Sequence, residues 1–424
     1  MYSVMKKSKI VLLIAILSVC VILAGIFFVK YQNRKNRTIL SLTMEQKLQD
    51  YEELCSILDT SYPFWKEAED AGIDKEALYV EYREYIQKTK NDIDFFKEIN
   101  YFLKELKGFG HLTVLDGYRY RQYLTALNAS DVLSEKQKEN IKSLESVLYN
   151  PVSSTTYGLL DQSHAGFRSI KGLKSDYNET VQDEENSRML PLEADIQPDI
   201  GYAYVKVDSF ALERYPMDKI FFTNLFHEIH DIPNLIIDLR ENSGGSDLYW
   251  QDFLVKPNAR ESLFSQRIFL FNDSEYNREY FSDNGLHCEP IETAPELYAS
   301  KYRSRFTHYT VDTTSFKKSD NPYEGKIWIL TSEKVYSASE NFVMFCKNTG
   351  FAYLVGTPTG GDGGMLDPML LSLPNSGLIV RFSPLYGTNS DGEGNEACGT
   401  PPDILISEEE DAFEKCKSMI NNTK

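Results

Sequence analysis

The sequence has few basic residues for its acidic content. Its 424 residues include 45 lysines and arginines against 63 aspartates and glutamates, which gives a formal net charge of -18 at pH 7. A protein that binds phosphate backbones needs a positively charged face, so we expect no nucleic-acid partner. Hydrophobic residues make up 42% of the chain, enough for a sizeable core, which excludes a disordered or fibrous protein.

Metal-binding patterns are also absent. The six cysteines include no CxxC pair and show no metal-ligand spacing. His227 and His230 stand in a HEIH segment, which lacks the H-E-x-x-H spacing that places two zinc ligands and a base together. The sequence therefore predicts no metal site, and nothing in it implies a cofactor.

Long hydrophobic runs are rare, and one stands out. Residues 10–29 carry no charge, and this length suits a helix that crosses a bilayer core of roughly 30 Å. Lysines precede the run and no small-residue cleavage pattern follows it, which favours an uncleaved signal anchor over a cleaved signal peptide. Lipidation at Cys20 fits less well, because Val19 is not small. We predict a cytoplasmic tail at 1–9, a transmembrane helix at 10–29 and a stalk at 30–42, in a single-pass protein of the cell membrane whose remainder is extracytoplasmic.

The next region has a helical pattern. Between Thr43 and Lys107 apolar residues recur at spacings of three and four, which is typical of amphipathic helices. Glycines at 108 and 110 then break the pattern, and apolar residues resume in alternation. We expect an N-terminal helical domain of three or four helices at 43–116. A middle insertion at 117–199 follows, and it lacks the carboxylate-binding loop of a PDZ domain.

Beyond residue 200 short apolar strands alternate with helices. Strand, helix, strand at this spacing predicts right-handed crossovers in a largely parallel sheet. A hairpin at 369–382 adds antiparallel strands. The fold is expected to be mixed α/β, with a sheet-and-helix domain at 200–408 and a C-terminal helix or tail at 409–424. The expected strands lie at 201–207, 234–240, 326–332 and 351–356, and the expected helices at 217–230 and 338–347.

Ser337 stands where a buried strand ends and a helix begins. A serine at this junction lies near unpaired backbone amides and the positive end of the helix dipole, which together stabilise negative charge on a reacting carbonyl oxygen. Ser337 and Glu340 also fit the S-x-x-E capping box, in which the serine only caps the helix. Taken alone, the pattern favours capping.

Paired glycines follow another predicted strand. Gly244 and Gly245 let backbone amides approach a ligand closely, and with the amide of Ala338 they are candidates for an oxyanion hole. Asp238 and Arg240, at the end of the same strand, favour a structural ion pair over a catalytic role.

Two further candidates are weak when taken singly. His111 follows a glycine at the start of a predicted strand, and a lone histidine is more often structural than a base. Glu396 lies in the loop at 392–406, where carboxylates are usually only solvated. The order of these residues and of the other motifs along the chain strengthens their candidate functional roles.

Five ordered motifs resemble the serine peptidase family that includes tricorn protease and the C-terminal processing (tail-specific) proteases. The resemblance covers residues 43–406 apart from the middle insertion. It implies a ClpP/crotonase-like catalytic domain that hydrolyses peptide bonds in protein or peptide substrates. The motifs are Gly110-His111, IIDLRENSGG at 236–245, Ser337-Ala338-Ser339-Glu340, GTPTGGDG at 356–363, and Glu396 with Gly399, Pro402 and Asp403.

The resemblance also implies a mechanism. In the C-terminal processing branch a lysine 25 residues after the nucleophile is the base, but that position is Asp362 here, and a carboxylate cannot act as a neutral amine. The tricorn-like branch uses a histidine of the GH motif and a glutamate of the last motif. The implied roles are nucleophile for Ser337, general base for His111, orientation of the imidazole for Glu396, and oxyanion hole for Gly244 or Gly245 with Ala338.

Three alternatives remain open. His164, next to Ser163, is the second candidate for the base, although it lacks the helix-to-strand context of His111. The chain could be a pseudopeptidase that binds peptides or acts as a scaffold. It could also be an esterase with the same serine chemistry, which the absence of a GxSxG elbow disfavours. The sequence does not indicate the substrate or the oligomeric state.

Overall fold

The computed structural model describes residues 40–128, 144–162, 191–211, 214–407 and 409–421. The expected transmembrane segment at 10–29 and His164 lie outside these residues. None of the helices in the described part of the chain is long and apolar enough to cross a membrane.

The N-terminal region is helical, as the apolar spacing predicted. Thr43 and Gln46 form a capping box at the first helix, and Asn91 caps the last long one. A 3-10 turn, η1 (Phe109–His111), and a short strand, β1 (Thr113–Val114), follow. The predicted helices are α2 (Met44–Ser61), α3 (Trp65–Asp70), α4 (Lys75–Gln87) and α5 (Asp92–Glu105), and two further helices, α6 (Gly117–Asn128) and α8 (Pro151–Gln162), lie within the expected middle insertion.

The main sheet contains the parallel strands that the sequence predicted. Its described strands lie in the order β13-β9-β8-β4-β3-β2, and every neighbouring pair is parallel except β2 with β3. The strands are β2 (Ala194–Gln197), β3 (Tyr202–Lys206), β4 (Asn234–Asp238), β8 (Lys326–Thr331), β9 (Tyr353–Gly356) and β13 (Ile404–Leu405).

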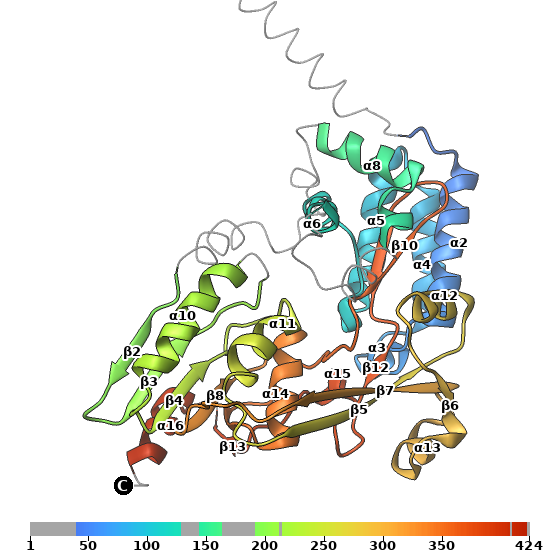
Figure 1. Ribbon diagram of the computed structural model, residues 1–424. Coiled ribbons are helices and arrows are strands. Elements are labelled where there is room, and N and C mark those ends of the chain that lie inside the picture. Colours follow the sequence, from blue (N-terminus) through green and yellow to red (C-terminus); the bar gives the residue numbers. More distant parts are fainter. Residues whose placement is uncertain (1–39, 129–143, 163–190, 212–213, 408, 422–424) are drawn as a thin grey trace, which may run out of the picture.

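Helices cover both faces of this sheet. In β4, Leu235 and Ile237 point to the face packed by α10 (Tyr215–Glu228), α11 (Asp247–Trp250) and α14 (Ala338–Thr349), while Ile236 points to the face packed by α16 (Ala412–Asn421). Burial on both faces explains why β4 is a continuous apolar run. Figure 1 shows α14 and α16 beside the central strands.

Two antiparallel sheets complete the described fold. One has the order β12-β5-β7-β6, and the other pairs β1 with the predicted hairpin as β1-β11-β10. Their strands are β5 (Leu263–Phe271), β6 (Glu289–Pro290), β7 (His308–Phe316), β10 (Met369–Ser372), β11 (Ile379–Phe382) and β12 (Tyr386–Gly387). The short helices nearby are α12 (Glu275–Asp283), α13 (Glu296–Tyr302) and α15 (Asn395–Cys398).

The helical region and the later strands share one hydrophobic core. Buried side chains of α2 and α5, such as Leu54 and Phe96, belong to the same cluster as Phe269 of β5 and Phe382 of β11. Figure 1 shows β10 running up among these helices. The core therefore crosses the boundaries at 116 and 200 that the sequence suggested, and it fixes the GH segment against the strands that follow residue 200.

Candidate active site

Ser337 occupies a strained turn between β8 and α14. Its backbone has φ 59° and ψ -124°, a conformation that residues with a side chain seldom adopt. Its side chain makes no capping hydrogen bond, so the capping-box interpretation is wrong. Since no described group bonds to Ser337 Oγ, the hydroxyl is not used to hold the fold.

The rest of the S-A-S-E motif holds this turn in place. Ser339 Oγ lies 2.5 Å from the carbonyl oxygen of Asn242 and accepts a hydrogen bond from the Tyr336 amide at 3.2 Å. Glu340 is fully buried, and its Oε1 accepts from Asn395 Nδ2 and Thr400 Oγ1, each at 2.6 Å. The motif thus ties the nucleophile turn to the glycine loop and to the loop that carries Glu396.

The glycine loop packs directly on the nucleophile turn. A Cβ at Gly244, where φ is 110°, would lie 2.9 Å from the Cβ of Ser337, so only glycine allows this approach. The Gly244 amide donates to Asn242 Oδ1 at 2.9 Å. The amides of Gly245 and Ala338 bond to no described residue, and they are therefore the two oxyanion-hole candidates with an available N–H.

His111 is the last residue of η1. Gly110, with φ 59°, allows close packing, since a Cβ there would lie 2.1 Å from Phe64 Cε2. The Gly110 carbonyl accepts from the Ser383 amide at 2.7 Å. His111 itself has φ 61°. The GH segment is thus anchored to the shared core on one side and faces the nucleophile turn on the other.

The carboxylate in contact with His111 is Asp362. Its Oδ2 lies 2.7 Å from His111 Nε2, although the two groups are not aligned as a hydrogen bond. The imidazole also meets the ring of Tyr336 edge-on, with 5.2 Å between ring centroids. Burial lowers the pKa of His111, the charge of Asp362 opposes this shift, and Arg381 adds to it. The histidine therefore favours its neutral form, as a general base requires.

A short parallel pairing brings Asp362 to the histidine. Tyr336 forms a bridge with Gly361, and the Ser337 amide donates to the Gly361 carbonyl at 3.2 Å. Asp362 follows in the left-handed region with φ 51°. The nucleophile and Asp362 are therefore held by adjacent stretches of backbone.

Glu396 lies beside the histidine without contacting its ring in the described structure. Its Oε1 accepts from the Gly110 amide at 3.2 Å, and Tyr336 Oη donates to the same oxygen at 3.2 Å. Burial raises the pKa of Glu396 well above its usual range, and the charge of Asp362 raises it further. Glu396 thus holds the backbone before His111, whereas the expected contact with the imidazole is made by Asp362.

The remaining candidates are structural. Arg240 pairs with Asp238 at 2.7 Å, which confirms the predicted ion pair. His227 and His230 are exposed on and after α10. The described residues contain no group of three or more histidines, cysteines or carboxylates that is placed to hold a metal ion.

The chain is similar to known peptidases in sequence and in fold. Residues 201–406 match the sequence model of peptidase family S41. A candidate peptidase from Parabacteroides merdae is 19% identical, with a TM-score of 0.53, and the match covers 88% of this chain and 96% of the other. Mature CPAF complexed with lactacystin is 12% identical, with a TM-score of 0.53, and the match covers 90% of this chain and 99% of that one. Identities this low show a shared fold alone.

The strand-to-helix serine, the glycine loop and the family match together define a serine peptidase. Residues 201–406 form a domain of peptidase family S41.

Proposed function

We propose that the chain cleaves protein or peptide substrates through an acyl-enzyme on Ser337, with His111 as the general base. The observation that carries this proposal is the geometry of Ser337. It sits at a strained turn that hydrogen bonds of Tyr336 and Ser339 hold in place, while its own hydroxyl bonds to no described group. Strain of this kind is retained at sites where it serves a function.

The reaction divides into two halves. Ser337 Oγ attacks the scissile carbonyl while the imidazole takes the hydroxyl proton, and the same imidazole then gives that proton to the leaving amine. Water attacks the resulting ester in the second half, again with His111 as base. The amides of Gly245 and Ala338 hold the oxyanion in each tetrahedral intermediate. Asp362 and Glu396 do not take the proton from serine.

The two carboxylates have different roles in this proposal. One imidazole nitrogen of His111 lies beside Asp362, so the other nitrogen accepts the serine proton. The carboxylate of Asp362 then stabilises the imidazolium that forms. Glu396 fixes the Gly110 amide and the Tyr336 hydroxyl, and so sets the position of the histidine. The absence of a lysine at position 362 supports a histidine base over a Ser-Lys dyad.

Active-site labelling tests the proposal. The full-length chain in detergent is treated with a fluorophosphonate probe, alongside Ser337→Ala and His111→Ala. We expect the probe to label the wild type but neither Ser337→Ala nor His111→Ala. A folded wild type that is never labelled but retains peptides uncut would instead support the pseudopeptidase. Faster turnover of small acyl esters than of any peptide would support the esterase.

We also propose that the peptidase is extracytoplasmic and anchored in the cell membrane by residues 10–29. The support is the uncharged run itself, preceded by lysines and lacking a cleavage pattern. In cells expressing the chain with a C-terminal epitope, protease added outside should remove the epitope, and the protein should stay with the membranes after alkaline washing. An epitope protected until the membrane is opened would contradict this topology.

A further inference from the structure

Asn341 lies one turn after the nucleophile and makes hydrogen bonds to three other segments of the chain. It is buried in α14, and its backbone amide donates to the Ser337 carbonyl at 2.9 Å. Its Nδ2 donates to the carboxylate of Asp247, at 3.1 and 3.0 Å from the two oxygens, and to the Gly364 carbonyl at 2.7 Å. Its Oδ1 accepts from Arg267 Nη1 at 2.7 Å. Both polar atoms of this buried side chain are therefore engaged.

The contact with Asp247 fixes the oxyanion loop. Asp247 is the first residue of α11 and follows Gly245, the oxyanion-hole candidate, by two positions. Its carboxylate also accepts from Trp250 Nε1 at 2.9 Å. Burial raises the pKa of Asp247 to about 6, against the bonds from Trp250 and Asn341 that lower it, so the group is ionised at pH 8 and accepts both bonds.

The contact with Gly364 fixes the loop that carries Asp362. Asn341 holds the Gly364 carbonyl directly, and Arg267 Nη1 donates to the Gly363 carbonyl at 3.3 Å. A Cβ at Gly363 would lie 3.0 Å from Asn341 Oδ1, so this backbone packs closely against the side chain. The two peptide carbonyls that follow Asp362 are therefore both held from α14 and β5.

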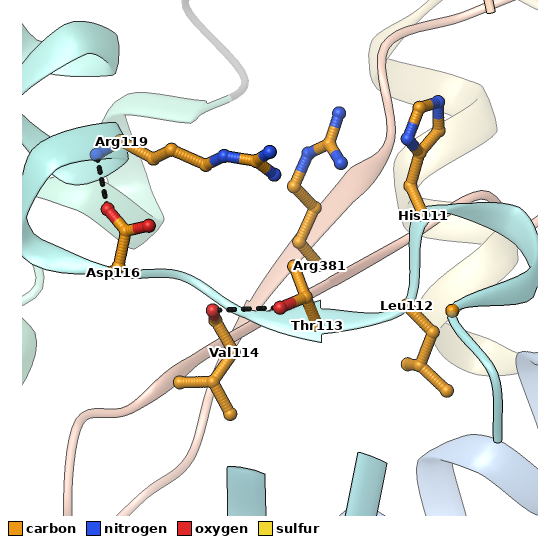
Figure 2. A pocket seen from close by; sticks show the side chains of 8 residues that line it. His111, Leu112, Thr113, Val114, Asp116, Arg119 and Arg381 are labelled. Carbon is orange, nitrogen blue, oxygen red and sulfur yellow. Dashed lines mark hydrogen bonds between the residues drawn. The ribbon is translucent and has the colours of Figure 1, made fainter. Parts of the chain in front are cut away.

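The position of Asp362 in turn determines the surroundings of the base. Asp362 Oδ2 lies 2.7 Å from His111 Nε2. On its open side His111 lines a pocket of about 240 Å³ together with residues of β1, β11 and α6, and Figure 2 shows no hydrogen bond from the imidazole to the other residues drawn there. A shift of the Asp362 loop would therefore change the contact that orients the imidazole.

We propose that Asn341 is a positioning residue that holds both halves of the site in place, the oxyanion loop through Asp247 and the carboxylate at His111 through the glycines after Asp362. The inference rests on the proposed peptidase function and adds a residue that touches neither the substrate nor the base. An amide suits this role because one planar group both donates and accepts. Leucine has a similar size but can do neither.

Histidine titration tests the link to Asp362. The full-length chain in detergent, with Ser337→Ala and labelled histidines, is titrated by nuclear magnetic resonance with and without Asn341→Leu. We expect Asn341→Leu to lower the pKa of His111, because the carboxylate charge that raises this pKa moves away. In an Asp362→Asn background the same substitution should leave the pKa of His111 unchanged. The inference is overturned if the pKa does not fall, or if it falls equally in both backgrounds.

A milder variant keeps the test decisive if Asn341→Leu does not fold. Arg267→Lys retains the charge but lacks the planar fork that reaches Asn341 and Gly363 together. It should lower the pKa of His111 by a smaller amount, and Asp362→Asn should again abolish the shift. An unchanged pKa in a folded Arg267→Lys would overturn the inference.

Asn348→Leu is the matched control. Asn348 lies seven residues further along α14, and its Nδ2 donates to Ser265 Oγ of β5 at 3.1 Å. The substitution removes a similar bond between the same helix and the same strand, so the pKa of His111 should stay unchanged. A shift as large as that of Asn341→Leu would show that loosening of α14 alone is responsible, and would overturn the inference.

The rate of fluorophosphonate labelling at pH 8 tests the link to the oxyanion loop. With Ser337 present, Asn341→Leu should slow labelling by about 100-fold, the order expected when reacting groups are misplaced by about 1 Å. Asp247→Asn should slow it by about tenfold, as one charge-assisted bond is weakened, and should leave the pKa of His111 unchanged. Unchanged labelling in both variants would overturn the inference. The titration needs no catalysis, so a wild type that titrates as expected but is never labelled refutes the peptidase proposal alone.

Discussion

Three residues around the reaction centre hold backbone conformations that L-amino acids seldom adopt. Among the described non-glycine residues with positive φ are His111, Ser337 and Asp362, at 61°, 59° and 51°. Each such residue costs roughly 1–3 kcal/mol unless the surrounding structure enforces it. Here the enforcing contacts are backbone pairing at Gly361 and the anchored carbonyl of Gly110. Strain is concentrated where the chemistry is proposed.

Ser337 and Ser339 should separate activity from stability. Ser337→Ala should lower kcat/KM by more than about 1,000-fold and leave the free energy of unfolding unchanged, because its hydroxyl bonds to no described group. Ser339→Ala should cost about 1–3 kcal/mol in stability, because it removes the buried bonds to Asn242 and Tyr336. Denaturant unfolding and a peptide-cleavage assay measure both quantities. Loss of stability in Ser337→Ala would show that the hydroxyl has a structural partner.

The pH dependence of His111 should move in opposite directions in two variants. Asp362 raises the pKa of His111 and Arg381 lowers it, so Asp362→Asn should lower that pKa further and Arg381→Gln should raise it. A base works in its neutral form, so the acid limb of kcat/KM should shift to lower pH in the first variant and to higher pH in the second. Nuclear magnetic resonance titration of labelled histidines in a Ser337→Ala background gives the pKa directly. Shifts of the same sign in both variants would contradict the arrangement.

The sequence singled out Ser337 and His111 as candidates, but it did not reveal which carboxylate contacts the imidazole. Ser337 and His111 stand in motifs whose order along the chain is informative. Asp362 drew attention only as the position where a lysine is missing. Its contact with His111 depends on a two-residue pairing between Tyr336 and Gly361, which no spacing in the sequence indicates.

At the scale of elements, α14 is tied to the loop around α15 by one buried carboxylate. Glu340 Oε1 accepts from Asn395 and Thr400, while its other oxygen has no partner among the described residues. Burial raises the pKa of Glu340, which reduces the cost of holding it in the core. This link positions Glu396, the neighbour of Asn395, against the GH segment.

Glu340→Ala should therefore impair both stability and catalysis. Two buried donors lose their acceptor, and each costs about 1–3 kcal/mol. The loop that carries Glu396 also loses its attachment to α14, so kcat should fall in the protein that remains folded. Glu340→Gln is the matched control, because its amide oxygen can accept both bonds. Unfolding curves measure the stability, and activity per folded molecule measures the catalysis. Equal stability and equal kcat in the Ala and Gln variants would show that the acceptor oxygen of Glu340 is not responsible for either effect.

The main helices and parallel strands were predictable because their apolar patterns are local. The antiparallel pair of β5 with β7 was not, although it pairs nine residues in register from Leu263 with Phe316 to Phe271 with His308. The strands are separated by α12, β6 and α13, so no hairpin turn marks the pairing in the sequence. β5 also mixes alternating burial with a continuous buried stretch, which obscures a period of two.

At the scale of the whole molecule, the N-terminal helices complete the catalytic region. They share a hydrophobic core with β5 and β11, and polar contacts cross the same junction. Asp50 of α2 accepts from the Asn375 and Ser376 amides in the β10–β11 hairpin, at 2.9 and 2.7 Å. Glu67 of α3 accepts from Tyr386 Oη at 2.8 Å and pairs with Arg305. His111 reaches the nucleophile turn only because this junction is formed.

A fragment that lacks the helices should therefore fail to fold by itself. Residues 40–421 are expected to unfold in one cooperative transition. Residues 191–421 should instead bind a hydrophobic dye and melt without a sharp transition, because the apolar faces of β10, β11 and β5 that the helices bury become exposed. Co-expression with residues 40–162 should restore a folded complex that the fluorophosphonate probe labels at Ser337. Calorimetry and dye binding decide the question. A cooperative transition of 191–421 near that of 40–421 would show two independent domains, and His111 would then be delivered to the site by docking instead of by a common core.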